Sequence, residues 1–244
     1  MLYQHQIIRE CTEQIETKPK NPNHYFSRAQ AYKEIGDYNA AIADLTRVIQ
    51  MSPNSPQAYL LRGTIYQNLK NYHNASRDFS SAIQIKADYA DAYILRGNIH
   101  RKVSDLPLAI ADASVAISYA PDDVQAYVLR GNCQQDLGNY DYAIEDYSKA
   151  IRINSNYANA YYFRGNCYHL VDQDEDAIED YQQAVRIAPD SYSGRLAIQR
   201  LKGLGADIVS LGAPKRTMDI FRPKIPSQTI KRHFVKIWSE MKKR

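Results

Sequence analysis

The sequence has few cysteines and no long apolar run, and both shortages narrow the class of protein. Mean hydropathy is −0.55, and no apolar stretch approaches the roughly 18 residues that a transmembrane helix needs, so none is expected. The start, MLYQHQIIRECTEQ, lacks the charged, apolar and small segments of a secretory signal. The three cysteines, Cys11, Cys133 and Cys167, lack metal-ligand spacing and cannot all pair as disulfides. We therefore predict a cytoplasmic protein in a reducing setting, with peripheral membrane attachment left open.

The usual signatures of catalysis are also missing. The six histidines are scattered, with no H-x-x-x-H pair and no histidine placed beside a cysteine by the pattern of the chain. No glycine-rich loop is suited to cradling a phosphate. The acidic run DQDEDAIED falls on a predicted turn and helix start, where carboxylates favour the helix dipole. The sequence thus predicts a protein that is not an enzyme and that holds no metal and no cofactor.

One heptapeptide recurs along the chain. AYVLRGN at Ala126 has near-copies at Ala58 (AYLLRGT), Ala92 (AYILRGN) and Ala160 (AYYFRGN), with a weaker copy, HYFSRAQ, at His24. Successive copies are 34 residues apart. A fixed period of this length indicates a repeat architecture. The five units begin at Pro22, Pro56, Ala90, Val124 and Ala158.

The residue types within a unit predict two helices. Position 4 is always tyrosine, position 8 is glycine or alanine, position 20 is always alanine and position 27 is alanine or valine. Positions 4, 8 and 11 share one helical stripe, and positions 20, 24, 27 and 28 share another. Small residues at positions 8, 20 and 27 would let the two backbones approach closely. A turn lies between the helices, with glycine at position 15 in two units and Lys70, Ser104 and Asp172 in the others. Pro107, in the loosest unit, falls at an expected helix start.

This pattern resembles the tetratricopeptide repeat (TPR) family over Pro22 to Ser191. The resemblance implies an all-α fold, a right-handed α-solenoid of five TPR helix pairs with capping helices. Residues 1–21 are interpreted as an N-terminal half-repeat cap, 22–191 as the five units, 192–205 as a C-terminal capping helix, and 206–244 as a basic linker with an amphipathic helix.

Two charged series run in step through the units. Position 7, usually leucine in the family, is arginine in every unit, and position 23 is always aspartate. A partly buried guanidinium needs a partner, and its fork suits a carboxylate. We hypothesise a ladder of Arg–Asp pairs, within or between units, that fixes helix register. The competing interpretation is that the arginines face a groove and bind acidic ligands.

The resemblance places the partner-binding face on the first helix of each unit. Amides at position 9 can both donate to and accept from the backbone of an extended peptide, and apolar residues at position 5 would form pockets. The predicted binding residues are Asn98, Asn132 and Asn166 at position 9, and Phe26, Leu60, Ile94, Val128 and Tyr162 at position 5. The alternative is that position 5 only packs helices and the asparagines only cap or face solvent. The chain lacks the family's set for clamping chaperone carboxylates.

The last 39 residues carry a net charge of +7, against −3 for residues 1–205. Within them, SQTIKRHFVKIWSEMKKR predicts an amphipathic helix. Its candidate binding residues are Phe234, Ile237, Trp238, Lys242, Lys243 and Arg244. This helix could dock on the solenoid, bind a partner protein, lie on an anionic membrane, or contact nucleic acid through phosphates.

Two functions follow. The first is a scaffold or adaptor that binds another protein, as an extended or helical segment, in the concave groove. The alternative is a recruiter whose tail targets a membrane or nucleic acid while the solenoid carries a protein cargo.

Overall fold

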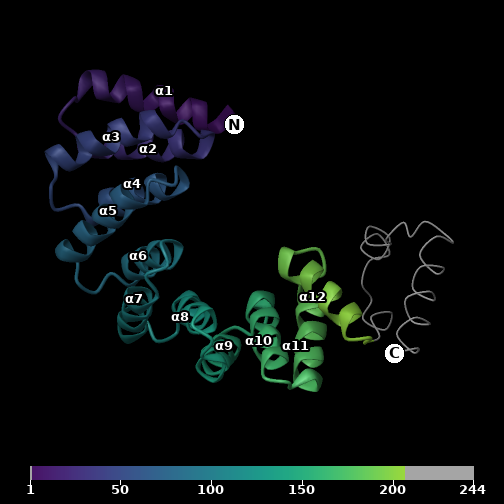
Figure 1. Cartoon of the computed structure of the whole chain (residues 1–244). Coiled ribbons are helices and arrows are strands. Elements are labelled where there is room, and N and C mark those ends of the chain that lie inside the picture. Colours follow the sequence, from purple (N-terminus) through teal and green to yellow (C-terminus); the bar gives the residue numbers. More distant parts are fainter. Residues whose placement is uncertain (1, 207–244) are drawn as a thin grey trace, which may run out of the picture.

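The computed structural model describes residues 2–206, and all the regular secondary structure within that range is α-helical (Figure 1). The helices are α1 (Leu2–Thr17), α2 (Pro22–Ile35), α3 (Tyr38–Met51), α4 (Pro56–Asn68), α5 (Tyr72–Ile85), α6 (Ala90–Lys102), α7 (Leu106–Tyr119), α8 (Val124–Asp136), α9 (Tyr140–Ile153), α10 (Ala158–Leu170), α11 (Asp174–Ile187) and α12 (Tyr192–Gly203). The predicted α-solenoid is confirmed. Each of the five units contributes a first helix (α2, α4, α6, α8, α10) and a second helix (α3, α5, α7, α9, α11).

Helix starts follow the local sequence. Asp37, Asn71 and Asp105 are the N-caps of α3, α5 and α7, and each side chain accepts a hydrogen bond from the backbone N–H three residues further on. Pro107 lies in the first turn of α7, as predicted, where its missing N–H leaves no helical hydrogen bond unmade. Polar caps and prolines thus set the boundaries that the repeat requires.

The turn between the paired helices requires a left-handed residue at position 15. Gly36 and Gly138 adopt it with φ of 83° and 79°. Lys70, Ser104 and Asp172 adopt the same conformation with φ of 58°, 64° and 60°, although a side chain disfavours it. Packing of the two helices therefore imposes the turn, even where the sequence does not supply glycine.

The helix pairs stack into an arc with the first helices on its inner side (Figure 1). Each helix packs on the next one along the chain, and from α4 onward the first helices of neighbouring units also contact each other. The second helices of neighbouring units make at most marginal contact with one another. The first helices are therefore the more closely spaced layer, and the surface they present is called the inner face below.

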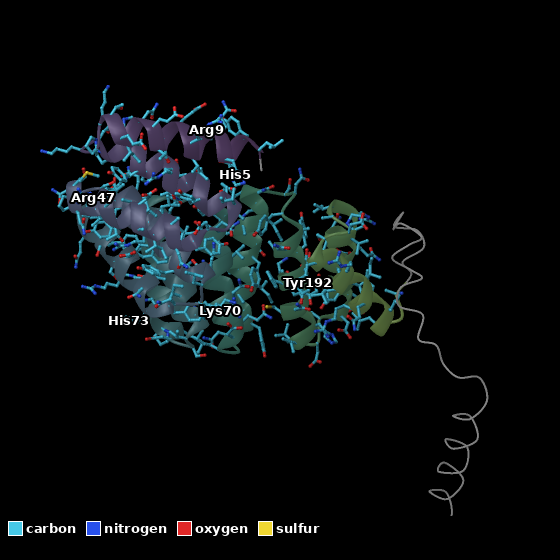
Figure 2. All side chains as sticks on the ribbon, turned by 90° about the horizontal axis from the view of Figure 1, so that it is seen from above. His5, Arg9, Arg47, Lys70, His73 and Tyr192 are labelled. Atoms are coloured by element: carbon cyan, nitrogen blue, oxygen red, sulfur yellow. The ribbon has the colours of Figure 1, made fainter. Side chains whose placement is uncertain are left out.

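Two further helices cover the ends of the described stack. α1 packs on α2, and α12 packs on α11 and α10. Ala197, Ile198 and Leu201 of α12 are buried, whereas Tyr192 at its start is 74% exposed (Figure 2). None of the helices in residues 2–206 has the length and apolar character to cross a membrane. The predicted tail helix, with its candidate binding residues, lies outside the described residues.

Candidate functional site

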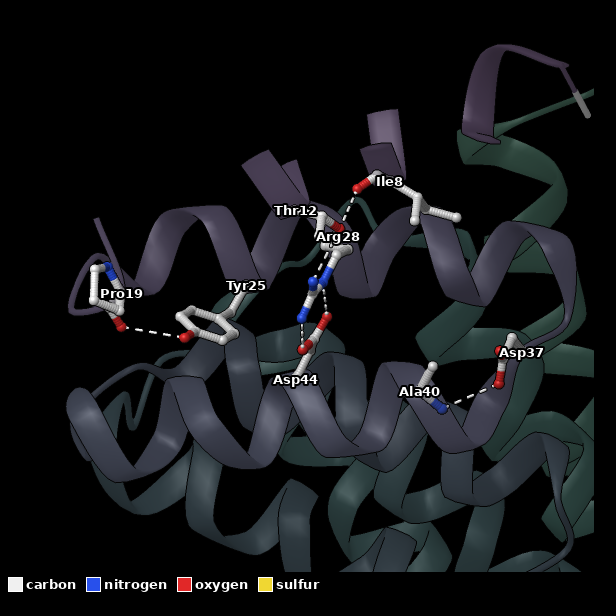
Figure 3. Close-up of polar contacts among 8 residues, drawn as sticks. All are labelled: Ile8, Thr12, Pro19, Tyr25, Arg28, Asp37, Ala40 and Asp44. Atoms are coloured by element: carbon white, nitrogen blue, oxygen red, sulfur yellow. Dashed lines mark hydrogen bonds and ion pairs between the residues drawn. The ribbon is translucent and has the colours of Figure 1, made fainter. Parts of the chain in front are cut away.

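The arginine at position 7 binds the aspartate at position 23 of its own unit. In the first unit, Nε of Arg28 donates to Oδ2 of Asp44 and Nη2 donates to Oδ1, both at 2.8 Å (Figure 3). The same two-pronged pair recurs as Arg62–Asp78, Arg96–Asp112, Arg130–Asp146 and Arg164–Asp180. The aspartate side chains are only 5–8% exposed, against 16–29% for the arginines. The hypothesis of an Arg–Asp ladder is confirmed, and its pairs lie within units.

A third hydrogen bond links each arginine to the preceding second helix. Nη1 of Arg28 donates to Oγ1 of Thr12 in α1 at 3.0 Å (Figure 3), and Nη1 of Arg62 donates to Thr46 at 3.0 Å. The corresponding acceptors in the remaining units are Ser80, Ser114 and Ser148. All of these hydroxyls stand at position 25 counted in the repeat. These hydroxyls were not among the residues predicted from the sequence, although a serine or threonine recurs every 34 residues from Thr12 to Ser148.

Each guanidinium also lies beside the tyrosine at position 4 of its unit. The five distances from the guanidinium carbon to the ring centroid are 5.6–5.9 Å, within cation–π range. Hydrogen bonds to the paired aspartate raise the pKa of Arg28, Arg62, Arg96 and Arg130, so these groups stay charged. With its nitrogens engaged inside the stack, the arginine joins three helices. The structure does not favour the alternative that it binds an acidic ligand.

The glycine at position 8 makes room for an aromatic ring from the second helix. A Cβ on Gly131 would lie 2.9 Å from the ring of Tyr147, and one on Gly165 would lie 2.9 Å from the ring of Tyr181. In the second unit, Gly63 has the same relation to the ring of Phe79, at 2.7 Å. The small residue at position 8 therefore leaves room for the side chain at position 24 of the second helix, and this is the close contact that the sequence predicted.

The asparagine that follows this glycine accepts the hydroxyl of the same ring. Tyr147 donates to Oδ1 of Asn132 at 2.8 Å, and Tyr181 donates to Oδ1 of Asn166 at 2.9 Å. Oε1 of Gln135 also lies 3.0 Å from the Tyr147 hydroxyl. In these two units each residue of the RGN motif thus has its own contact. The arginine binds the aspartate at position 23, the glycine leaves room for the tyrosine ring, and the asparagine accepts a hydrogen bond from the tyrosine hydroxyl.

Asn98 has a different environment, because position 24 of its unit is Ala113. Its Nδ2 donates to the carbonyl oxygen of Ile94 in its own helix at 2.9 Å. The space over Gly97 is filled by Leu129 of the next unit, whose Cδ2 would lie 2.8 Å from an added Cβ. The three predicted asparagines therefore stand at equivalent positions without equivalent bonding.

The apolar residues predicted to form pockets lie mostly in the core. Ile94, Val128 and Tyr162 are only 6–7% exposed and belong to hydrophobic clusters. Phe26 and Leu60 are partly buried and pack against such clusters. The residues at position 5 therefore serve mainly in helix packing, and only some of them reach the inner face.

Two hollows open beside the first helices. One of about 480 Å³ lies between α10 and α12, with Tyr162, His169, Leu196 and Leu204 among its lining residues. Another of about 250 Å³ is lined by residues of α2, α3 and α4, including Asn23, Phe26 and Gln57. Tyr162 and His169 line the larger hollow, whereas Asn166, on the same stripe of α10, is not among its lining residues. Within residues 2–206, no cluster of three or more His, Cys, Asp or Glu side chains could hold a metal ion.

Models of the tetratricopeptide repeat match residues 56–89, 124–157 and 158–191, and a TPR repeat model matches residues 29–70. Together these ranges cover more than half of the chain. No curated protein sequence matches it.

Solved structures with the same fold are numerous but distant in sequence. YrrB, a TPR protein described as having an unusual peptide-binding site, has 22% identity and a TM-score of 0.62; the match covers 79% of this chain and 97% of YrrB. MamA from Desulfovibrio magneticus RS-1 has 20% identity and a TM-score of 0.64, over 70% of this chain and 97% of that one. A chain of the APC/C hetero-tetramer Cut9–Hcn1 has 18% identity and a TM-score of 0.66, with 79% of this chain matching 38% of that one.

Proposed function

Since the chain belongs to the tetratricopeptide repeat family, we propose that it is a non-catalytic scaffold that holds a polypeptide partner on its inner face. The partner lies as an extended segment across successive first helices. The description of YrrB as a peptide-binding TPR protein supports this assignment by analogy of fold.

The proposal rests on the polar side chains of the inner face that take no part in the Arg–Asp ladder. The arginines at position 7 and the aspartates at position 23 bind each other in the ladder. The polar side chains that remain at position 2 of the first helices are mainly uncharged amides. Position 2, exposed in every unit, is Asn23, Gln57, Asp91, Gln125 and Asn159. Amides offer both donors and acceptors to a main chain, and the two hollows can receive side chains of the held segment.

A phage-displayed dodecapeptide library selected on the full chain tests the proposal. Selected peptides are expected to bind the unmodified chain and to lose affinity when Gln125→Lys and Asn159→Lys are introduced together on the inner face. The matched control replaces Asn39 and Tyr142, exposed residues of second helices, by lysine. Failure to select any binder, or equal losses in the two double variants, would contradict the proposal.

The charge of the tail supports a second candidate function. Residues 206–244 have a net charge of +7, which suits an anionic membrane or a nucleic acid. If the tail is a recruiter, these residues fused to a fluorescent carrier bind anionic vesicles or RNA, and the binding weakens as salt rises. A fusion that binds neither would remove this alternative.

A further inference from the structure

Acidic charge is concentrated in the fourth and fifth units. Residues 124–191 hold eleven acidic and five basic side chains, a net charge of −6, whereas residues 22–123 hold ten of each. Six of these acidic side chains lie at the turns between the paired helices and at the starts of α9 and α11. They are all exposed, and they are Asp136, Asp141, Asp172, Asp174, Glu175 and Asp176. Residues 136–142 and 170–176 are called the acidic edge below.

The acidic edge also exposes apolar side chains around a hollow. Leu137, Tyr142 and Leu170 are 47–64% exposed. A hollow of about 250 Å³ between the two turns is lined by residues 138–142 and by Val171. Carboxylates at the start of α11 favour the helix dipole, but the dipole does not account for apolar side chains in solvent beside them. An apolar patch with a charged rim is typical of an interaction site.

Most carboxylates of the acidic edge lack a cation. Oδ2 of Asp136 lies 2.7 Å from Nε of Arg101, and Oδ1 of Asp174 lies 2.6 Å from Nδ1 of His169. Within residues 2–206, no ion pair is formed by the other four, Asp141, Asp172, Glu175 and Asp176. The electrostatic complement of this surface is a basic segment.

We propose that residues 227–244 dock on the acidic edge of their own molecule. This segment has six basic residues against Glu240, and it has Phe234, Ile237 and Trp238 at helical spacing. Its apolar side chains cover the exposed leucines and enter the hollow, while its basic side chains pair with the carboxylates. The acidic edge lies at the ends of the helices, so docking leaves the inner face open, and the inference does not rest on the proposed function.

The described chain ends beside the acidic edge. Gly203 and Leu204 line the 480 Å³ hollow together with His169, whose ring contacts Asp174. Because α8, α10 and α12 follow one another along the stack (Figure 1), α8 lies two helix spacings, about 20 Å, from α12. Residues 207–227 can span up to about 70 Å. The segment can therefore reach both turns of the acidic edge.

The equivalent edge of the second and third units provides the internal contrast. It also exposes apolar residues, Leu69 and Val103, but they stand beside the exposed Lys70 and Lys102. These lysines repel a basic segment, whereas the carboxylates of the fourth and fifth units attract one. Charge therefore selects which of two apolar edges the segment covers.

The fluorescence of Trp238, the only tryptophan, reports on this segment alone. In the full chain at about 50 mM salt, its emission should lie at a shorter wavelength than in an isolated peptide of residues 227–244. Raising the salt to about 500 mM should move the emission towards that of the peptide, because the ion pairs are screened. Equal emission from the chain and the peptide at low salt would overturn the inference.

A charge-reversal variant locates the site. Asp141→Lys/Asp172→Lys/Glu175→Lys should show the emission of the peptide already at low salt, with an unchanged circular dichroism spectrum. The matched control makes the same charge change at the opposite ends of the helices and should keep the short-wavelength emission. It replaces the exposed residues Asp88, Asp122 and Asp190 by lysine. Equal effects of the two triple variants would overturn the assignment to the acidic edge.

Carbodiimide cross-linking of the unmodified full chain shows directly where the segment lies. Amide bonds should join Lys231, Lys236 or Lys242 to carboxylates of the acidic edge. In a mixture of isotope-labelled and unlabelled chains, the two joined peptides should carry the same label, because docking occurs within one molecule. Cross-links confined to other carboxylates, or a random mixture of labels, would contradict the proposal.

Discussion

Individual residues of the RGN motif have separate partners in the second helix. Arg130 binds Asp146, Gly131 receives the ring of Tyr147, and Asn132 accepts its hydroxyl. The Arg–Asp relation could be predicted from the sequence, because both series are complete and in register. The tyrosine–asparagine relation could not, because it occurs in two units of five and depends on side-chain orientation that periodicity does not encode.

The first residue-scale prediction concerns the Arg130–Asp146 pair. Arg130→Leu should lower the free energy of unfolding by about 3–5 kcal/mol, because it leaves a buried carboxylate unpaired. The double variant Arg130→Leu/Asp146→Leu should recover a large part of that loss. Urea unfolding of the two single variants and the double variant measures the coupling; additive losses would show that the pair does not interact.

The second prediction starts from Gln67, whose buried Oε1 has no hydrogen-bond partner within residues 2–206. Gln67 stands at the same repeat position as Gln135, whose Oε1 lies beside the Tyr147 hydroxyl, but its unit has Phe79 in place of tyrosine. Rotating the amide would only exchange an unpaired acceptor for unpaired donors. Phe79→Tyr should therefore stabilise the chain by about 0.5–1.5 kcal/mol.

The mirror variant Tyr147→Phe is its control. It should destabilise the chain by about 1–2 kcal/mol, because it removes the hydroxyl that donates to Oδ1 of Asn132. Thermal unfolding of both variants decides the matter, and a loss of stability in Phe79→Tyr would refute this explanation of Gln67.

The third prediction concerns two buried cysteines. Burial raises the pKa of Cys133 to about 11 and that of Cys167 to about 12, from an ordinary value of 9.0. Both should therefore react with iodoacetamide at pH 8 at least about 100-fold more slowly in the folded chain than in urea, since the thiolate is the reactive form. Fast labelling of the folded chain would contradict the burial.

The same shifts predict a loss of stability in alkali. Above pH 9 the unfolded chain releases these protons while the folded chain retains them, so the free energy of unfolding falls as pH rises from about 9 towards 11. Each cysteine contributes at most about 1.4 kcal/mol per pH unit. Cys133→Ala should flatten the decline, and an unchanged slope would show that Cys133 does not cause it.

At the scale of the helical elements, packing decides where the sequence alone is ambiguous. Helix boundaries could be predicted because capping residues, prolines and the 34-residue period agree. The left-handed turns at Lys70, Ser104 and Asp172 could not, because nothing local favours them and only the pairing of two long helices imposes them. Position 5 is divided in the same way: Ile94 and Val128 are buried in hydrophobic clusters, whereas Phe26 and Tyr162 line the two hollows.

Replacing a strained turn residue by glycine should stabilise a helix pair. Ser104 is exposed, and its φ of 64° costs a side chain about 1–2 kcal/mol. After the entropy cost of glycine in the unfolded chain, Ser104→Gly should gain about 0.5–1 kcal/mol, whereas Ser104→Ala should gain nothing. Thermal unfolding distinguishes them; a lower melting temperature for the glycine variant would show that the turn carries no such strain.

At the scale of the whole molecule, the arginine at position 7 repeats the same set of hydrogen bonds in every unit and so links each unit to the one before it. Each arginine ties its own two helices to the preceding second helix, so register passes from unit to unit and the first helices form one inner face. The solenoid could be predicted from periodicity, since each unit must bury its apolar stripes against a neighbour. The partner could not, because the amides on the inner face specify a main chain and not a particular sequence.

The central claim is that this inner face is where a polypeptide is held, and site-specific photo-crosslinking tests it most directly. A benzophenone side chain is placed at Asn159, exposed on α10, or at Tyr142, which is 64% exposed on α9, and the full chain is irradiated with a selected peptide. The account predicts a covalent adduct from position 159 and none above background from position 142. An adduct from position 142 alone would contradict it.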